Sequence, residues 1–469
     1  MQPTSHAFKQ NVHRALGDAD LQKSLAFFKA GFAVKRDEAA ARLPEFEALR
    51  DTGIAIKKHV LAHLDFYLER FATNVEKAGG QVHWCSTPDD GRKAVLEILR
   101  TYGATTATKS KSMVAEEMGI NEFLEENGIE PVETDLGEYI VQLAHEKPSH
   151  ILAPAIHKTK DQVADLFLAR HKTKRLTEAT DMVAEARQFL RPRYLAAGAG
   201  ITGANFLIAE TGSIILVTNE GNAELTQILP KVHIVLATVE KVIPTLDDAS
   251  TFLRLLARSA TGQEFGTYTT LATGPRRAGD PDGPEAFHVI LLDNGRTKIL
   301  NSEFREILRC IKCGACMNAC PVYGTVGGHA YGWVYPGPIG AALAPNLIGL
   351  EEARHLPNAS TFCGRCESVC PMRIPLPKLM RQWREQEHVK KLSASRYRWG
   401  LGLWAFAAKR PTLYAMGARA GSRILRCFGA SRGRFASLPL AGGWTATRDF
   451  PAPEGTTFRT AWARRGRSG

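Results

Sequence analysis

The chain has 469 residues, 44% of them hydrophobic, and this length suggests two or three domains with cores of their own. No apolar run reaches the roughly 18–20 residues that a membrane-spanning helix needs, and the first residues contain no signal-peptide apolar region. The formal net charge is +12, but residues 391–469 carry fifteen Lys and Arg residues against two acidic ones. The basic character therefore belongs to the C-terminal extension, and the rest of the chain is nearly neutral.

Residues 1–78 are expected to form an N-terminal helical segment. Apolar residues such as Leu21, Leu25 and Phe32 recur at three- and four-residue steps, which is the spacing of one helix face. A Gly-Gly pair at 79–80 ends this stretch.

Residues 79–297 alternate short apolar strands with amphipathic helices. The expected strands are Val82–Cys85, Ile151–Ala153 and Ile234–Ala237. The expected helices between them include Gly91–Tyr102, Ala115–Asn127 and Lys160–Lys172. Strands that alternate with helices predict an α/β domain with a mainly parallel sheet covered on both faces.

One segment, residues 203–222, breaks this rhythm. Two β-rich runs, Ala204–Ala209 and Ser213–Thr218, flank a Thr-Gly pair and are expected to form a hairpin. Open α/β sheets bind ligands beyond the carboxyl ends of their strands. Five polar residues of this segment are therefore candidates for a ligand pocket, although local sequence alone favours ordinary turn residues: Glu210, Thr211, Glu220, Gly221 and Asn222.

A second domain is expected over residues 298–389. A last strand and an Asp-Asn-Gly turn at 293–295 close the α/β part, and a short helix around Glu303–Leu308 follows. Two cysteine blocks come next, separated by a Gly/Pro-rich connector that includes residues 335–338. This connector is expected to wrap the group that the cysteines bind and partly to exclude water from it.

Seven of the nine cysteines lie within 61 residues, in two blocks that each end in Cys-Pro. The first block has the C-x2-C-x2-C-x3-C-P spacing of bacterial ferredoxins, in which the fourth cysteine usually serves the other cluster of a pair. Zinc is the main competing metal, but structural zinc sites favour two separated ligand pairs. Nothing else in the chain indicates the oxidising compartment that disulfides need. The pattern therefore predicts iron–sulfur clusters held by Cys310, Cys313, Cys316, Cys320, Cys363, Cys366 and Cys370.

The second block lacks one cysteine, and alignment of the two blocks puts Ser360 at the missing position. The interleaved scheme gives one cluster Cys310, Cys313, Cys316 and Cys370, and leaves the other with Cys320, Cys363 and Cys366. The second cluster is then either [4Fe–4S] with a non-cysteine ligand or [3Fe–4S]. Ser360 is a candidate ligand or, more simply, a helix N-cap or turn hydroxyl. Cys85 and Cys427 are expected to be small buried apolar residues.

Residues 390–469 form a basic C-terminal extension. Its candidate partners are an acidic protein surface or anionic lipid headgroups, and a merely solvated segment is the alternative. Nucleic acid fits less well, because no recognition module accompanies the charge. Aromatic residues at helical spacing, among them Trp399, Trp404 and Tyr414, indicate an amphipathic helix pair. Such residues are more often core than membrane anchors.

The segment GANFLIAETGSIILVTNEGN at 203–222, followed by the two cysteine blocks and the basic extension, resembles the lactate utilisation protein B family. The resemblance implies a LUD domain of the NagB/RpiA/CoA-transferase type, preceded by helices and followed by a helical ferredoxin-like domain. It also implies two [4Fe–4S] clusters on the seven cysteines, in an iron–sulfur subunit that carries electrons during oxidation of L-lactate to pyruvate. Two companions are implied: a cysteine-rich iron–sulfur protein and a smaller LUD-domain protein. The resemblance supplies no catalytic residue for the LUD domain.

Three functions remain open on the sequence. No GxGxxG fingerprint follows an expected strand and no P-loop is present, so the chain lacks a visible hydride acceptor. An electron-transfer subunit is therefore the leading hypothesis. The alternatives are a stand-alone 2-hydroxy-acid dehydrogenase that uses the open cluster or the LUD pocket, and a metabolite-sensing binding or assembly protein. Reduced cysteines and the lack of a signal peptide predict a cytoplasmic protein, with peripheral membrane contact through the tail as a further expectation.

Overall fold

The computed structural model describes residues 2–29, 31–429, 431–438 and 441–465. The chain forms two compact units, residues 1–387 and 388–469, which are described separately below. The expected N-terminal segment and the expected C-terminal extension each include a few residues outside the described ranges. The finer division at residues 78, 297 and 389 stays a prediction.

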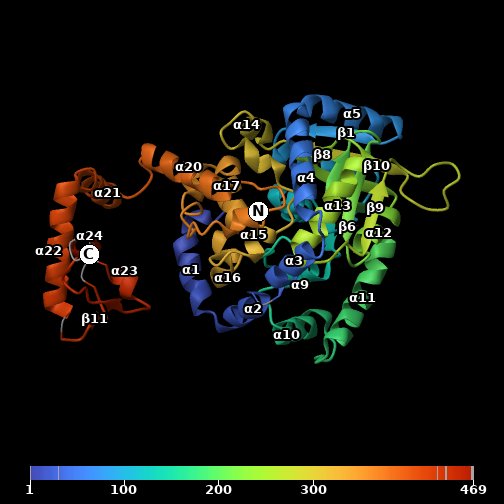
Figure 1. The fold of residues 1–469 in the computed structure, drawn as a ribbon. Coiled ribbons are helices and arrows are strands. Elements are labelled where there is room, and N and C mark those ends of the chain that lie inside the picture. Colours follow the sequence, from blue (N-terminus) through green and yellow to red (C-terminus); the bar gives the residue numbers. More distant parts are fainter. Residues whose placement is uncertain (1, 30, 430, 439–440, 466–469) are drawn as a thin grey trace. The chain divides into compact units, whose positions relative to one another are not determined.

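Most of the described residues up to position 78 are helical, as their periodicity predicted. After a short 3-10 turn, η1 (Ser5–Ala7), five helices follow: α1 (Phe8–Gly17), α2 (Ala19–Lys29), α3 (Phe32–Ala41), α4 (Phe46–Ala62) and α5 (Leu64–Lys77). They do not form one separate bundle. Helix α5 packs on the α/β part, and α1 and α2 contact the cysteine-rich part (Figure 1). Helices α3 and α4 contact both parts.

A six-stranded, fully parallel sheet forms the centre of the α/β part. Its strands are β1 (Gln81–Cys85), β2 (Thr106–Lys109), β3 (Glu130–Glu133), β4 (Ala199–Gly203), β7 (Val232–Thr238) and β10 (Ala286–Leu292), in the spatial order β1-β10-β7-β4-β2-β3. Every residue of β7 is buried, as expected for a central strand covered on both faces. The prediction of a mainly parallel, doubly covered sheet is therefore confirmed.

The connections of this sheet diverge between β2 and β4. From β2 the chain proceeds outward to β3, whereas from β4 it proceeds in the opposite direction to β7 and β10. Such a switch point is where open α/β sheets commonly bind ligands.

Different elements cover the two faces of the sheet. On one face the core is closed by α6 (Pro88–Thr101), α7 (Met113–Met118) and α8 (Ile120–Glu126). The expected helix at 115–127 is two helices, because Gly119 adopts φ 65° and ends the first. On the other face lie α5 and a second sheet of strand order β8-β5-β6-β9. The remaining elements of this part are α9 (Leu136–Leu143), α10 (Lys160–His171), α11 (Ala179–Ala196), α12 (Asn222–Ile228), η2 (Val239–Lys241), β8 (Val242–Ile243), α13 (Leu246–Thr261), β9 (Tyr268–Ala272) and α14 (Arg296–Leu300).

The expected hairpin is present as β5 (Phe206–Ile208) paired antiparallel with β6 (Ser213–Thr218). Its turn requires glycine at Gly212, where φ is 69° and a Cβ would lie 2.4 Å from the backbone nitrogen of Val75 in α5. The expected strand Ile151–Ala153 is wrong. That run is irregular, because its side chains pack beneath the first cysteine block: a Cβ on Gly314 would meet Leu152 at 3.1 Å.

The cysteine-rich part is built from short helices. They are η3 (Arg305–Arg309), α15 (Ala315–Asn318), α16 (Tyr323–Val326), η4 (His329–Tyr331), α17 (Gly337–Leu347), α18 (Leu350–Ala353), α19 (Arg365–Ser368) and α20 (Leu376–Val389). Figure 1 shows α1 and α2 beside α16, so the N-terminus and the cysteine blocks belong to one packed unit.

The C-terminal unit contains the expected helix pair, α21 (Ser395–Ala408) and α22 (Pro411–Gly429). Smaller elements follow: β11 (Arg434–Phe435), α23 (Gly442–Thr445), β12 (Phe450–Pro451) and α24 (Phe458–Arg465). The expectation that the aromatic residues form a core is wrong: Trp399 is 81% and Trp404 61% exposed, because the small unit holds too few elements to cover them. Cys427 is likewise exposed, contrary to expectation, whereas Cys85 is buried as expected. None of the helices in the described part of the chain combines the length and apolar character that a membrane crossing requires.

Candidate iron–sulfur centre

Four cysteines surround the first of two small cavities in the cysteine-rich part. They are Cys310, Cys313, Cys316 and Cys370. The backbone winds around the cavity through left-handed conformations at Lys312 (φ 58°) and Gly314 (φ 75°). The backbone N–H of Lys312 donates to Sγ of Cys310 over 3.3 Å. Apolar side chains complete the wall: Ile151, Ile311, Ile339, Met372, Ile374 and Leu376.

The second cavity receives the other three cysteines, together with hydroxyl groups. Its wall includes Cys320, Cys363, Cys366, Ser360 and Thr361. The backbone N–H of Tyr323 donates to Sγ of Cys320 over 3.4 Å. This contact resembles the one between the N–H of Lys312 and Sγ of Cys310 at the first cavity. Cys363 is exposed, so this cavity lies nearer the protein surface than the first.

The two cysteine blocks repeat one local geometry. Phe362 (φ 55°) and Gly364 (φ 80°) match the left-handed pair of the first block, and a four-residue helix follows in both. The backbone N–H of Phe362 donates to Oγ of Ser360 over 3.1 Å. The Ser360 hydroxyl therefore takes the place that Sγ of Cys310 has in the first block, and its expected role as a turn hydroxyl is confirmed.

The last cysteine of each block lies at the cavity that the other block surrounds. Cys320 follows α15 and Cys370 follows α19, and these two helices pack against each other. The thiols of both cavities are close enough that Cys366 acts electrostatically on Cys316. The structure thus brings together the two sets of cysteines that the spacing grouped.

The buried thiols need a cation to ionise. Burial raises the pKa of Cys366 to about 12 and that of Cys370 to about 11. Cys363 differs, because the backbone N–H of Arg365 and the hydroxyl of Thr361 lower its pKa. A coordinated metal deprotonates its thiol ligands outright, so iron would supply the missing positive charge. Soft sulfur donors in apolar walls fit an iron–sulfur cluster.

The surrounding chain fixes the cysteine blocks and covers them. From α4, the buried Arg50 donates to the carbonyl oxygens of Ser368 and, over 2.7 Å, of Cys370. The connector between the blocks is buried, with Tyr331 and Tyr335 among the largest fully covered side chains. It therefore shields the first cavity from water, as the sequence predicted.

A further cavity of about 160 Å³ lies beside the sheet's switch point. It is lined by residues after β2 (Ser110 to Val114) and by the last residue of β4 with the two that follow (Gly203 to Asn205). Lys312 and Tyr335 of the cysteine-rich part form its opposite wall. The α/β part and the first cysteine block therefore share this cavity.

The structure separates the five residues predicted for a LUD pocket. Glu220 and Asn222 line the cavity beside the switch point, and Gly221 lies between them. Glu210 and Thr211 are not brought there, because they form the β5–β6 turn, at the opposite end of the hairpin. Their turn packs on α5, where Nδ2 of Asn74 donates to the carbonyl oxygen of Glu210 over 3.0 Å.

A buried charge network joins the α/β part to the cysteine-rich part. Arg296 lies 2.7 Å from Glu117 and 3.0 Å from Glu240. Tyr335 donates to Glu117 over 2.6 Å, and the ammonium of Lys312 lies 4.3 Å from the centre of the Tyr335 ring. Sequence reasoning missed this network, although a lysine inside the first cysteine block was a visible signal.

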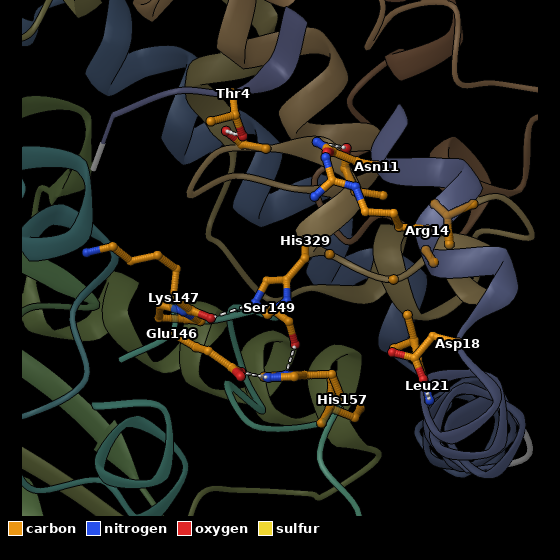
Figure 2. Close-up of a pocket in the computed structure, with 18 of the residues that line it drawn as sticks. Thr4, Asn11, Arg14, Asp18, Leu21, Glu146, Lys147, Ser149, His157 and His329 are labelled. Atoms are coloured by element: carbon orange, nitrogen blue, oxygen red, sulfur yellow. Dashed lines mark hydrogen bonds and ion pairs between the residues drawn. The ribbon is translucent and has the colours of Figure 1, made fainter. Parts of the chain in front are cut away.

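A cavity of about 700 Å³ lies between α1, residues 146–158 and the connector after α16. Figure 2 shows His157 between Glu146 and Ser149, with α1 residues across the cavity. The His157 ring nitrogens lie 2.7 Å from Glu146 and 3.0 Å from the Ser149 hydroxyl, and burial lowers the His157 pKa to about 4. Ser149 is buried and also 3.0 Å from the Pro154 carbonyl, so these contacts hold the loop rather than present a nucleophile.

Known proteins match the chain along nearly its whole length. The LUD domain family matches residues 68–292, the 4Fe-4S dicluster domain residues 306–374, and the family "Lactate utilisation protein B, C-terminal" residues 365–467. A Bacillus velezensis protein named lactate utilization protein B is 42% identical over 97% of this chain and 96% of its own. An Escherichia coli protein named uncharacterized electron transport protein YkgF is 40% identical over 97% of this chain and 95% of its own. A DUF162 family structure from Deinococcus radiodurans covers 49% of this chain and 98% of its own at 14% identity, with a TM-score of 0.28. Both cysteine blocks therefore lie within a 4Fe-4S domain.

Proposed function

The chain belongs to the lactate utilization protein B family, and on that premise we propose that it is an iron–sulfur electron-transfer subunit in the oxidation of L-lactate to pyruvate. The observation that carries the proposal is the gathering of seven cysteines at two neighbouring cavities. Oxidation of a 2-hydroxy acid releases two electrons. Clusters that each take one electron suit the task of carrying them away singly.

The cysteines divide between two clusters in this proposal. Cys310, Cys313, Cys316 and Cys370 would hold the first, and Cys320, Cys363 and Cys366 would hold the second. The chain's own contribution is to fix these ligands, to donate backbone N–H groups to their sulfurs and to exclude water. Hydrogen bonds to sulfur and burial set the reduction potential of such centres.

Anaerobic redox titration followed by EPR tests the electron-transfer role. We expect two one-electron transitions, one for each cluster, in the purified protein. Clusters that stay silent across the span of about −700 to +450 mV that iron–sulfur sites cover would instead indicate a structural or metabolite-sensing role.

We propose further that the hydroxyl of Ser360 would be the fourth protein ligand of the second cluster. It lines the same cavity as the three cysteines and accepts the backbone N–H that the equivalent ligand position accepts in the first block. Accepting that N–H does not exclude ligation, because Sγ of Cys310 accepts one too.

Replacing Ser360 by Ala should convert the second cluster to a three-iron form. Iron content is expected to fall from about eight to about seven per chain, with a new EPR signal from the oxidised protein. Ser360→Cys is the matched control, since a thiolate would restore a four-ligand site. Unchanged iron content and spectra in Ser360→Ala would leave Ser360 as a turn residue only.

Family membership also leads us to propose that the protein works with companions, a cysteine-rich iron–sulfur protein and a smaller LUD-domain protein. The C-terminal unit offers a contact surface, since α21 and α22 combine basic residues with exposed aromatic ones such as Trp399 and Trp404. Aromatic residues are enriched where proteins meet. Anionic lipid is the other candidate partner, and co-purification with the companions in the absence of lipid separates the two.

A further inference from the structure

The cavity beside the sheet's switch point carries an excess of positive charge. Three lysines reach it from three different elements: Lys111, Lys241 and Lys312. The acidic residues in its wall are Asp135, which lies 3.6 Å from Lys111, and Glu220, which is exposed. Two of the three lysines therefore have no carboxylate partner in this wall, and the cavity favours an anion.

Neither of these two lysines forms an ion pair with a residue that the structure describes, although the charge of the buried Glu240 acts on both. The ammonium of Lys241 donates to the carbonyl oxygen of Ala204, and that of Lys312 lies 4.3 Å from the centre of the Tyr335 ring. A carbonyl dipole and an aromatic face stabilise a cation but leave its charge in place. Burial lowers the pKa of Lys241 to about 8, so this group gains from a nearby negative charge.

Asn222 favours a ligand that carries a hydrogen-bond donor. It lines the same cavity and is only 8% exposed. Among the described residues, its Oδ1 has no hydrogen-bond partner. An unsatisfied buried acceptor costs free energy, which a ligand hydroxyl would recover.

The cavity also adjoins the first cluster site. Ile151 and Lys312 line both this cavity and the one that Cys310, Cys313, Cys316 and Cys370 surround. Lys312 additionally donates its backbone N–H to Sγ of Cys310. A molecule in the cavity is therefore separated from the cluster ligands by one layer of side chains.

We propose that this cavity binds a small 2-hydroxy carboxylate, with the carboxylate near Lys241 and Lys312 and the hydroxyl donating to Asn222. The volume of about 160 Å³ limits the ligand to a small acid. Two cations match the carboxylate and one buried acceptor matches the hydroxyl. The choice of lactate as a probe rests on the proposed function, whereas the class of ligand rests on these side chains.

Titration calorimetry on the anaerobically purified full-length protein tests the site. L-lactate is expected to bind about tenfold more tightly than propionate, which has the carboxylate but lacks the hydroxyl. Lactate should also perturb the EPR spectrum of the chemically reduced first cluster. Equal affinity for lactate and propionate, or no binding of lactate, overturns the proposal.

Variants locate the binding. Asn222→Ala should reduce lactate affinity about tenfold and leave propionate affinity unchanged. Lys93→Gln, on the exposed side of α6, is the control and should bind like wild type. Unchanged lactate affinity in Asn222→Ala overturns the proposal. If that variant fails to fold, the comparison of lactate and propionate affinities in the wild-type protein tests the proposal instead. Lactate binding with no cluster reduction even when the companions are present would count against the proposed electron-transfer role alone. Reduction through the companions without lactate binding would count against this site alone.

Discussion

Replacement of Cys313 by Ala is expected to remove the first cluster and to stop lactate-dependent reduction of the protein. Cys313 is 7% exposed and lies in a largely apolar wall with three other cysteines. None of the described residues in this wall has a side-chain oxygen that could replace its sulfur. Iron should fall from about eight to about four per chain. Iron and sulfide analysis with EPR of the anaerobic protein measures the loss.

The control for this variant is Cys427→Ala, because Cys427 is exposed in the C-terminal unit and belongs to neither cysteine set. It should retain full iron content and full reduction. A folded Cys313→Ala protein that reconstitutes with its companions and turns over normally would exclude the first cluster from the electron path.

Replacement of Lys109 by Met is expected to destabilise the α/β part by about 3–5 kcal/mol. Lys109 lies at the end of β2, fully buried, with its ammonium 2.7 Å from Glu133 and 3.4 Å from Glu116. Although burial opposes its charge, these carboxylates raise the pKa of Lys109. Together with Glu138 they form a group of three buried acids, which the variant would leave without a cation.

The stability that Lys109→Met loses relative to wild type should depend on pH. In the folded variant, burial and the repulsion between neighbouring acids would hold the pKa values of Glu133 and Glu138 further above the unfolded value, in the direction that burial already gives them. The folded state would then hold more protons than the unfolded state, so stability falls as pH rises. The difference between variant and wild type should therefore be smaller at pH 5 than at pH 8.

Amide hydrogen exchange in β2 and β3 measures this local stability without assuming that the whole chain unfolds in one step. The exposed lysine variant Lys93→Met is the control and should exchange like wild type. Equal protection of β2 and β3 against exchange in Lys109→Met and wild type, at both pH values, would contradict the role of Lys109 in stabilising the buried acids.

The parts of the fold that the sequence predicted correctly depend on local pattern. Strand β7 and the β5–β6 hairpin are continuous apolar or β-branched runs bounded by turn residues, so short windows of sequence contain their signal. The grouping of the cysteines was predictable because a fixed spacing in one loop dictates which thiols can reach one cluster.

The failures depend on contacts between distant segments. Ile151 has the composition of a strand residue but packs under the first cysteine block, far along the chain. Glu210 and Asn222 share one segment, yet the hairpin sends them to opposite ends of the sheet layer. The burial of Lys109 among acids from β3, α7 and α9 likewise has no local signal. The expectation that Cys427 is buried rested on its residue type alone, and no pattern in the surrounding sequence indicated a core there.

EPR of the anaerobic protein during addition of L-lactate, with and without the two companion proteins, tests the electron-transfer role most directly. The account predicts about eight irons per chain and cluster reduction by lactate only when the companions are present. Reduction of the isolated protein by lactate alone would contradict it, and would make this chain the dehydrogenase itself.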